Sequence, residues 1–211
     1  MNVKDFLNFN MNPIKLNFYI KDDVIELAQK LLGKFIFTKI DNDPITGGMI
    51  VETEGYKGTE DKACHAYNGR KTKRNEVMYE IGGVAYVYIC YGMHALLNVV
   101  TNKKDTPDAV LIRAIEPIEG IDTMLKRRDK MKIERNLTAG PGSLTKSLGV
   151  TKKLNGYTFD NKNLWIEDRN ITIKKEDILS SKRVGIDYAL EHKDLPWRFR
   201  IKNSKWTSLA K

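Results

Sequence analysis

The sequence predicts a mixed α/β fold of the α+β kind, in which the strands are mainly antiparallel. Two observations favour this class. Runs of β-branched and aromatic residues come in pairs joined by short turn segments, whereas only a few stretches have helical periodicity. No internal repeat or low-complexity linker divides the 211 residues, so we expect an N-terminal arm over residues 1–20 and one domain over residues 21–211.

The first helix is expected to begin at Asp23. Asp23 and Glu26 have the spacing of a capping box, and apolar residues then repeat at helical intervals from Val24 to Leu32. Gly33 follows, and glycine readily takes the left-handed conformation that ends a helix.

Two hairpins are expected in the first half of the chain. Their strands are residues 34–40 with 49–53, across a turn at 41–48, and residues 84–91 with 95–101, across Gly92-Met-His. Glu54 then lies where the second strand ends, and Tyr91 lies at the tip of the second hairpin. Glu52 is assigned the opposite strand parity from Glu54 and is expected to face elsewhere.

Side chains alternate along a strand, which separates the residues of the second hairpin into two faces. Tyr86, Tyr88 and Cys90 share one face, while Val87 and Ile89 share the other and are expected in the core. The remaining expected elements are a strand at 109–115, helices from Pro117 to about Arg128 and from Gly142 to Leu148, and strands at 171–174, 183–186 and 197–202.

Composition narrows the function classes. The chain has 36 Lys and Arg against 27 Asp and Glu, a net charge of +9, which favours a polyanionic partner such as nucleic acid. The only two cysteines, Cys64 and Cys90, have no metal-ligand spacing, so we expect no metal, cofactor or disulfide framework. The N-terminus has no secretory signal and no stretch approaches a membrane span, which favours a cytoplasmic protein without a membrane partner.

Chemistry-bearing residues concentrate between Val51 and Asn98. Glu54 follows an apolar strand, where partial desolvation would favour a base, although an isolated strand-end glutamate is more often a solvated charge. His65 precedes a basic loop made of Arg70, Lys71, Lys73 and Arg74, and it could equally be a satisfied structural histidine. The tyrosines could be core residues, but a ring at a hairpin tip such as Tyr91 has little core to enter. A second basic cluster covers Lys126 to Lys132 and could be a solvated helix face.

The order and spacing of these residues resemble the alkyladenine (3-methyladenine) DNA glycosylase family of the mixed α/β type, not the helix-hairpin-helix type. The resemblance runs from about Phe18 to Ser208. Its motifs are Val51-Glu-Thr-Glu-Gly-Tyr56, Leu111-Ile-Arg-Ala-Ile-Glu-Pro-Ile-Glu-Gly120, Gly140-Pro-Gly-Ser-Leu-Thr-Lys-Ser-Leu-Gly149, Arg183-Val-Gly-Ile186, Pro196-Trp-Arg-Phe199 and Trp206.

The resemblance implies a curved sheet with flanking helices and a protruding hairpin that enters the DNA minor groove. It implies a monofunctional enzyme that flips alkylated or deaminated purines out of duplex DNA and hydrolyses the N-glycosidic bond without lyase activity. By position, Glu54 matches the general base and Arg113 a residue that positions the water and phosphate. The matches to the base pocket are Tyr56, His65, Tyr86, Tyr88, Asn98, Leu111 and Val184. The DNA contacts are expected at Tyr91, the wedge, and at Met93, Arg70, Lys71, Lys73 and Arg74.

Three residues depart from the family pattern and put the substrate range in doubt. Ser143 stands where a lysine is common, Gly55 replaces the usual alanine, and His94 stands where an aromatic is frequent. Two other functions stay open: a noncatalytic nucleic-acid binding module, and a relative of the C-terminal domain of tRNA formyltransferases. We expect the partner to be double-stranded DNA with damaged purines and the protein to act as a monomer.

Overall fold

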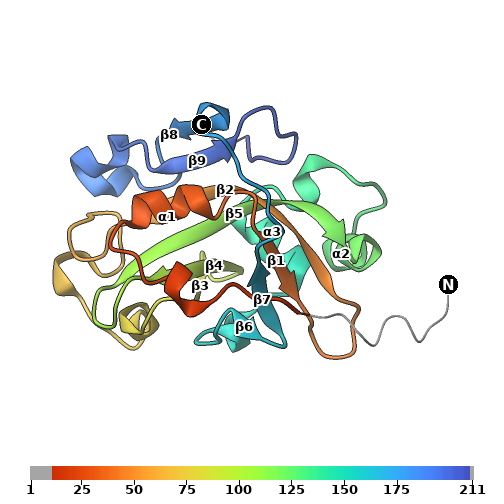
Figure 1. Ribbon diagram of the computed structural model, residues 1–211, viewed down its shortest axis with the longest axis horizontal. Helices are drawn as coiled ribbons and strands as arrows, with labels where there is room; N and C mark the ends of the chain where they lie inside the picture. Colours follow the sequence, from red (N-terminus) through yellow and green to blue (C-terminus); the bar gives the residue numbers. More distant parts are fainter. Residues whose placement is uncertain (1–10, 210–211) are drawn as a thin grey trace.

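The computed structural model describes residues 11–209, and within this range the chain forms an α+β domain (Figure 1). The α-helices are α1 (Val24–Lys30), α2 (Ile121–Arg128) and α3 (Pro141–Leu148). The strands are β1 (Phe35–Thr38), β2 (Thr46–Tyr56), β3 (Ala85–Cys90), β4 (His94–Thr101), β5 (Asp108–Glu119), β6 (Asp160–Asn161), β7 (Leu164–Glu167), β8 (Ile178–Ser181) and β9 (Arg198–Ile201). Short 3-10 helices are η2 (Leu16–Phe18), η3 (Tyr67–Gly69), η4 (Glu76–Tyr79), η5 (Arg135–Leu137), η6 (Lys152–Leu154), η7 (Lys175–Asp177) and η8 (Asp187–Asp194).

One antiparallel sheet joins these strands in the order β3-β4-β5-β2-β1-β7-β6. Strand β2 pairs with β5 along one edge, and along its other edge with β1 at Thr46–Met49 and then with β9 at Glu52–Glu54. Register shifts between β2 and β5 interrupt the ladder on either side of Glu52. Bulges of this kind bend a strand and increase its twist, which accounts for the curved sheet. The mainly antiparallel, curved α+β fold is therefore confirmed.

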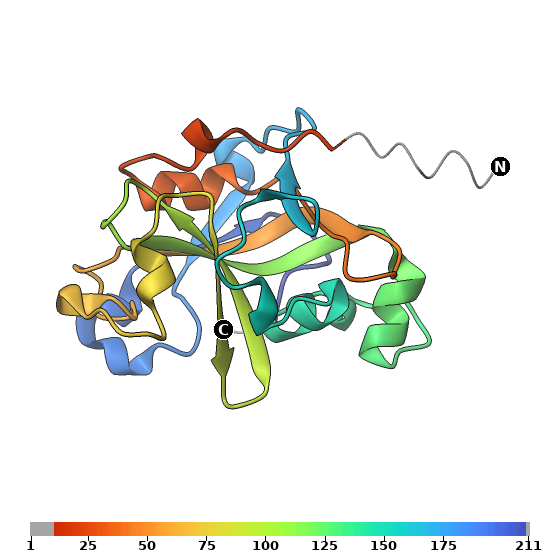
Figure 2. The same cartoon turned by 90° about the horizontal axis from the view of Figure 1, so that it is seen from below.

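Val87 and Tyr86 lie on the faces of β3 that side-chain alternation predicts, whereas Ile89, which was also expected in the core, is only partly buried and is not part of the main core. Val87 lies in the main core with α1 and α3, while Tyr86 lies in a second cluster with Cys64 and Met78. Strands β3 and β4 pair from Ala85 with Val99 to Cys90 with His94, and Figure 2 shows their hairpin projecting from the body of the domain. The sheet thus has a packed face and a face that carries tyrosines.

Other local predictions are confirmed. The Asp23 carboxylate accepts hydrogen bonds from the backbone N–H groups of Ile25 and Glu26 at 2.9 and 3.0 Å, which caps α1. Gly33 has a φ of 82° just after the helix. Residues 1–10 of the expected arm lie outside the described range. In residues 11–20, Ile14 donates its N–H to Ile166 and Tyr19 is buried.

The helix expected from Pro117 is wrong at its start. Strand β5 continues to Glu119, with Pro117 opposite Gly48, and α2 begins only at Ile121. The break is at Gly120, whose φ of 66° lies in the left-handed region and whose missing Cβ would come within 2.2 Å of the Ile45 carbonyl oxygen. The sequence therefore predicted the start of a helix at a proline that lies near the end of a strand.

The C-terminal part also differs. Residues 171–174 and 183–186 form no strands, whereas β9 confirms the strand expected at 197–202 and β6, β7 and β8 were not anticipated. Ile173 packs on the main core without joining a β-ladder. Arg183 forms a buried ion pair with Asp61. No helix within residues 11–209 combines the length and apolar character needed to cross a membrane.

Candidate active site

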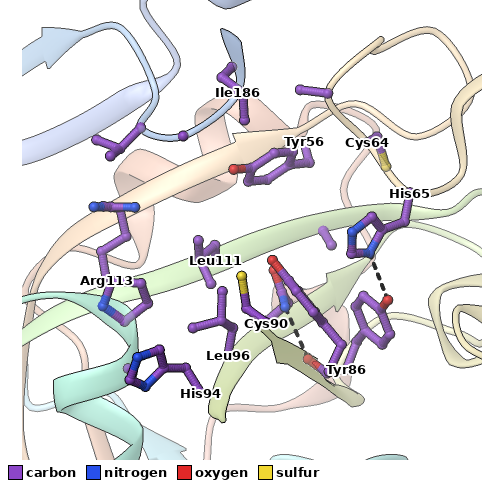
Figure 3. Close-up of a pocket in the computed structure, with 18 of the residues that line it drawn as sticks. Tyr56, Cys64, His65, Tyr86, Cys90, His94, Leu96, Leu111, Arg113 and Ile186 are labelled. Carbon is purple, nitrogen blue, oxygen red and sulfur yellow. Dashed lines mark hydrogen bonds between the residues drawn. The ribbon is translucent and has the colours of Figure 1, made fainter. Parts of the chain in front are cut away.

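A cavity of about 590 Å³ lies on the tyrosine-bearing face of the sheet (Figure 3). Its walls come from the sheet, the loop before His65, the first turn of α3 and the segment that begins at Val184. Ten of the residues predicted for the site line it: Tyr56, His65, Arg74, Tyr86, Tyr88, Tyr91, Asn98, Leu111, Arg113 and Val184. The fold thus brings together residues that are up to 128 positions apart in the chain.

Strand register arranges the floor of the cavity. Glu54 on β2 is opposite Leu111 on β5, Leu111 is opposite Asn98 on β4, and Asn98 is opposite Tyr86 on β3. Residues directly opposite in a sheet point to the same face, so these four form one row across four strands. Asn98 also donates its Nδ2 to the Tyr86 carbonyl at 3.1 Å, which fixes the plane of its amide.

Glu54 lies just behind the cavity with an exposed fraction of 0%. Its Oε2 accepts the Tyr56 hydroxyl at 2.9 Å, and its Oε1 accepts the Val184 N–H at 2.9 Å and lies 3.2 Å from Nη1 of Arg113. All three donors line the cavity. Since a carboxylate offers about four lone-pair sites, these donors leave room for one further hydrogen bond. The alternative of a solvated strand-end charge is wrong for Glu54.

Tyr56 keeps its proton. Burial, followed by the charge of Glu54 and the neighbouring Tyr88, raises the pKa of the Tyr56 hydroxyl well above its usual value. The phenol therefore serves as a donor to Glu54 at neutral pH. A side chain at the neighbouring Gly55 would point away from the cavity, because a Cβ there would come within 2.8 Å of the Ile25 side chain on α1.

The prediction that Glu52 faces the opposite side of the strand from Glu54 is wrong. Residues two apart in a strand share a face, and Arg113 contacts both carboxylates, donating its Nε to Glu52 at 2.8 Å. Glu52 also accepts the Arg198 Nε at 2.9 Å and the Ser208 N–H at 2.6 Å. Burial favours a higher pKa for the Glu52 carboxyl, but Arg113, the Ser208 N–H and Arg198 outweigh it, so the net shift is downward.

The rings of His65, Tyr86 and Tyr88 form an aromatic wall of the cavity. His65 Nδ1 lies 2.8 Å from the Tyr86 hydroxyl, and its ring meets that of Tyr88 edge-on at a centroid distance of 4.6 Å. Tyr86 and Tyr88 stack at 5.5 Å. Burial, then Arg74 and Arg70, lower the pKa of His65 to about 4, so the imidazole is neutral at physiological pH. This wall presents flat, uncharged surfaces to the cavity.

The hairpin tip is the most exposed aromatic position of the site. Tyr91 is 86% exposed and has a φ of 50°, and Met93 is 74% exposed. A non-glycine residue in the left-handed region is uncommon and marks a tight turn. Tyr91 lies at the cavity rim, whereas Met93 does not line the cavity.

The two basic clusters differ. Arg70, Lys71, Lys73 and Arg74 are exposed, and Arg74 reaches the cavity, with its guanidinium 5.6 Å from the centre of the Tyr88 ring. In the second cluster, Arg127 is used inside the protein, where it contacts Asp43, Thr46 and the Ser147 carbonyl. A phosphate-binding role for the whole of the second cluster is therefore not supported by its contacts.

Several residues that line the cavity were not among the predicted site residues. Cys64, Cys90 and Tyr188 line it, as do Gly140 to Ser143, which form the first turn of α3. Two departures from the family pattern, His94 and Ser143, lie in this wall, where His94 packs within 3.1 Å of the Cβ position of Gly142. The alternation that placed Cys90 beside Tyr88 was the one available signal for that residue.

Fold and site together define a class of protein: an α+β domain with a buried carboxylate behind an aromatic cavity and an exposed basic loop beside it. The chain belongs to the methylpurine-DNA glycosylase (MPG) family, whose model matches residues 17–205.

Similar proteins agree with this assignment. The chain is 48% identical over 192 residues to a protein of Chlamydia felis (strain Fe/C-56), covering 90% of this chain and 97% of the relative. It is 46% identical over 205 residues to one of Clostridium novyi (strain NT), covering 94% and 99%. Both relatives carry the name "Putative 3-methyladenine DNA glycosylase".

Proposed function

We propose that this protein is a DNA repair glycosylase that removes alkylated or deaminated purines from duplex DNA with a water activated by Glu54. The observation that carries the proposal is the Glu54 carboxylate, which is fully buried and held by Tyr56, Val184 and Arg113 directly behind an aromatic cavity. A cavity of about 590 Å³ is within the range of small-molecule sites, and a flipped purine is a ligand of that class.

In the proposed reaction, the N-glycosidic bond breaks and its electron pair leaves with the base. The water oxygen bonds to C1′, and its proton goes to Glu54. The transition state resembles an oxocarbenium ion, which the negative charge of Glu54 stabilises. Arg113 is shared between Glu54 and Glu52, and Glu52 is also paired with Arg198.

The cavity walls fit the proposed substrate class. A base made cationic by alkylation gains about 1 to 2 kcal/mol from electron-rich rings in a desolvated site. The neutral His65 adds no opposing charge. Asn98 on the floor is the candidate for discrimination against normal guanine, because its amide is fixed by the Tyr86 carbonyl.

The product is expected to be a free base and an intact abasic strand. Lyase activity of glycosylases needs an amine that bonds to C1′, and no lysine lines the cavity in the described part of the chain. Tyr91 would fill the gap in the duplex, and Arg70 to Arg74 would contact phosphates, with the protein acting as a monomer.

The test is excision from duplexes that each carry one damaged purine, assayed for free base and for heat-labile abasic sites. Glu54→Gln should lower excision by about 100- to 10,000-fold, the contribution of a general base, and leave binding to an abasic-site analogue nearly unchanged. Glu60→Gln, on the exposed Lys57–Glu60 pair, is the matched control. Full excision by Glu54→Gln would remove Glu54 from its role.

The same assay decides between the proposal and its alternatives. A noncatalytic binding module would bind these duplexes and release no base. A formyltransferase-like domain would also release none, and it would have no preference for damaged over undamaged duplex.

A further inference from the structure

We propose that the buried Asp61–Arg183 ion pair is a positioning pair, which sets the place of the two groups, Tyr56 and the Val184 N–H, that hold Glu54. This inference rests on the proposed function of Glu54. Neither Asp61 nor Arg183 lines the cavity, so both act through other residues.

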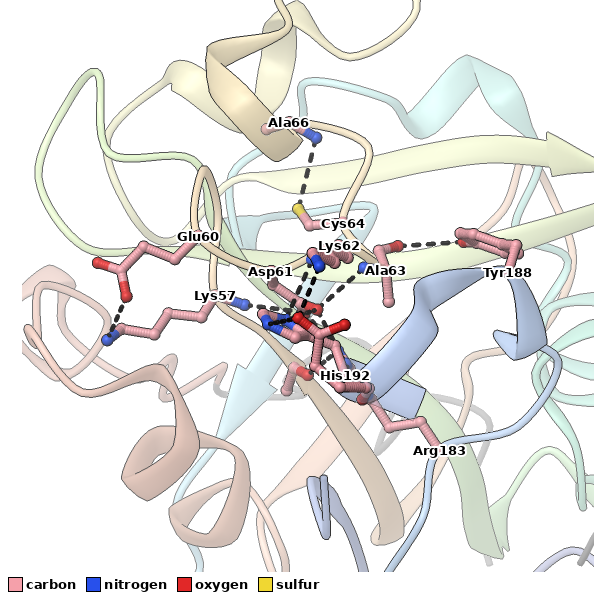
Figure 4. A network of polar contacts seen from close by, with 12 residues as sticks. Lys57, Glu60, Asp61, Lys62, Ala63, Cys64, Ala66, Arg183, Tyr188 and His192 are labelled. Atoms are coloured by element: carbon pink, nitrogen blue, oxygen red, sulfur yellow. Dashed lines mark hydrogen bonds and ion pairs between the residues drawn. The ribbon is translucent and has the colours of Figure 1, made fainter. Parts of the chain in front are cut away.

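Figure 4 shows the pair within a network of polar contacts. Both side chains are buried, with an exposed fraction of 0%. Nη2 of Arg183 donates to Oδ1 of Asp61 at 2.9 Å, and Nη1 donates to Oδ2 in a second, shorter bond. This two-bond arrangement fixes the plane of the guanidinium as well as its position.

Asp61 holds the loop that leads to His65. Its Oδ1 accepts the Ala63 N–H at 3.0 Å, and its Oδ2 accepts the Lys57 N–H at 3.3 Å. The aspartate therefore joins the end of β2 to the start of the segment that carries His65.

Arg183 holds the other two segments. Its Nη1 donates to the carbonyl of Gly55 at 3.0 Å, the residue between Glu54 and Tyr56, and its Nη2 donates to the His192 carbonyl at 3.2 Å. The next residue in the chain is Val184, whose N–H binds Glu54. A shift of Arg183 would therefore displace a donor to Glu54 and the backbone beside it.

The Arg183 guanidinium also packs between two rings. It lies 4.7 Å from the centre of the Tyr56 ring and 5.0 Å from that of Trp197. Tyr56 is thus supported from behind by a fixed cation while its hydroxyl donates to Glu54. Both neutral donors to the catalytic carboxylate depend on one guanidinium.

Stability gives little reason to bury this pair. Removing two charges from water is costly, and apolar residues of similar volume often stabilise a fold equally well or better. The arrangement has a clearer purpose in geometry, because misplacement by about 1 Å at a reacting group can cost on the order of 100-fold in rate.

The test separates rate from binding and from folding. Arg183→Lys keeps the charge but has neither the fork nor the flat surface, and we expect single-turnover excision at saturating enzyme to fall about 100-fold. The affinity for a duplex with an abasic-site analogue should stay within about threefold, because phosphate contacts dominate DNA affinity and are unaltered. Titration with that analogue gives the active fraction, which corrects the rate for misfolded protein.

Arg169→Lys is the matched control. Arg169 also packs against two rings, Phe35 and Phe37, and pairs with a carboxylate, Glu167, but none of these residues lines the cavity. Its excision rate should equal that of the wild type.

A second variant covers the case in which Arg183→Lys does not fold. Asp61→Asn combined with Arg183→Met removes both charges together and should keep the folded state, because no buried charge is left unpaired. We expect this stable protein to lose excision as well. Wild-type rates in either folded variant, or a loss explained entirely by the active fraction, would overturn the positioning role. If the wild type itself released no base, the proposed function would fail instead.

Discussion

Arg113 donates its Nε to Glu52 at 2.8 Å, while its Nη1 lies 3.2 Å from Glu54, so one guanidinium is shared by two buried carboxylates. Glu52 in turn accepts hydrogen bonds from Arg198 and Ser208, which ties the C-terminal segment to the site. The charge of each member is balanced within the cluster.

Glu52→Gln should destabilise the protein by about 3 to 5 kcal/mol at pH 7, the usual cost of breaking a buried pair. The pKa of the Glu52 carboxyl is lowered in the fold, so its contribution to stability is present above its ordinary value of 4.5 and is lost as pH falls below that value. The difference in urea unfolding between wild type and variant should therefore narrow as the pH falls from about 4.5 to 3. A difference that stays constant over this range would contradict the prediction.

His65 should stay neutral down to about pH 4. Burial, then Arg74 and Arg70, lower its pKa from the ordinary 6.5, so the unfolded chain binds this proton at a higher pH than the folded one. The contribution of His65 should therefore lower the stability as the pH is reduced from about 6.5 to about 4, and it should stay constant at lower pH. NMR titration of the imidazole nitrogens measures the midpoint, which Arg74→Gln should raise. A midpoint near 6.5 would show that the ring is open to solvent.

Tyr91→Ala should change the free energy of unfolding by no more than about 0.5 kcal/mol, since an exposed side chain makes few contacts. Excision from duplex DNA should nevertheless fall by about tenfold or more, because the variant cannot fill the vacated stack, and flipping costs a few kcal/mol. The loss should be much smaller for a damaged base in an unpaired bulge. Met131→Ala, at an equally exposed apolar residue, is the control, and equal duplex rates for Tyr91→Ala and wild type would reject the wedge role.

Lys73→Gln should weaken binding to all duplexes alike and reduce the slope of log K against log salt by about 1, the effect of losing one phosphate contact. Lys162→Gln, on the exposed turn between β6 and β7, should leave the slope unchanged. Fluorescence anisotropy at salt concentrations from about 50 to about 200 mM measures the DNA affinity of each variant and therefore both slopes. An unaltered slope for Lys73→Gln would remove this lysine from the DNA interface.

The sequence-based predictions were correct where they depended on local patterns. The cap at Asp23 depends on residues two and three positions away, and the faces of Tyr86, Val87 and Tyr88 depend only on alternation. The resemblance to a family supplied the positions of the cavity residues.

The missing parts depend on distant partners. Asp61 and Arg183 are 122 residues apart, and nothing near either one indicates the other. The helix predicted from Pro117 is wrong because a proline after an apolar run is equally compatible with a helix start, and its pairing with Gly48 on the neighbouring strand cannot be read from the local sequence. The misassigned parity of Glu52 was an error in applying alternation, which places residues two apart on the same face.

The row from Glu54 through Leu111 and Asn98 to Tyr86 has a consequence for how substrate range can evolve. Neighbouring strands are held about 4.8 Å apart by their backbone hydrogen bonds, so three steps along the sheet separate the backbones of Glu54 and Tyr86 by about 14 Å. Exchanging a side chain at Leu111 or Asn98 alters what the row presents to the cavity without altering that separation. Sliding a strand by one residue would turn its contribution to the opposite face. If the row contacts the flipped base as proposed, point substitutions within it can change the lesion preference, whereas a change of strand register would turn whole strands over.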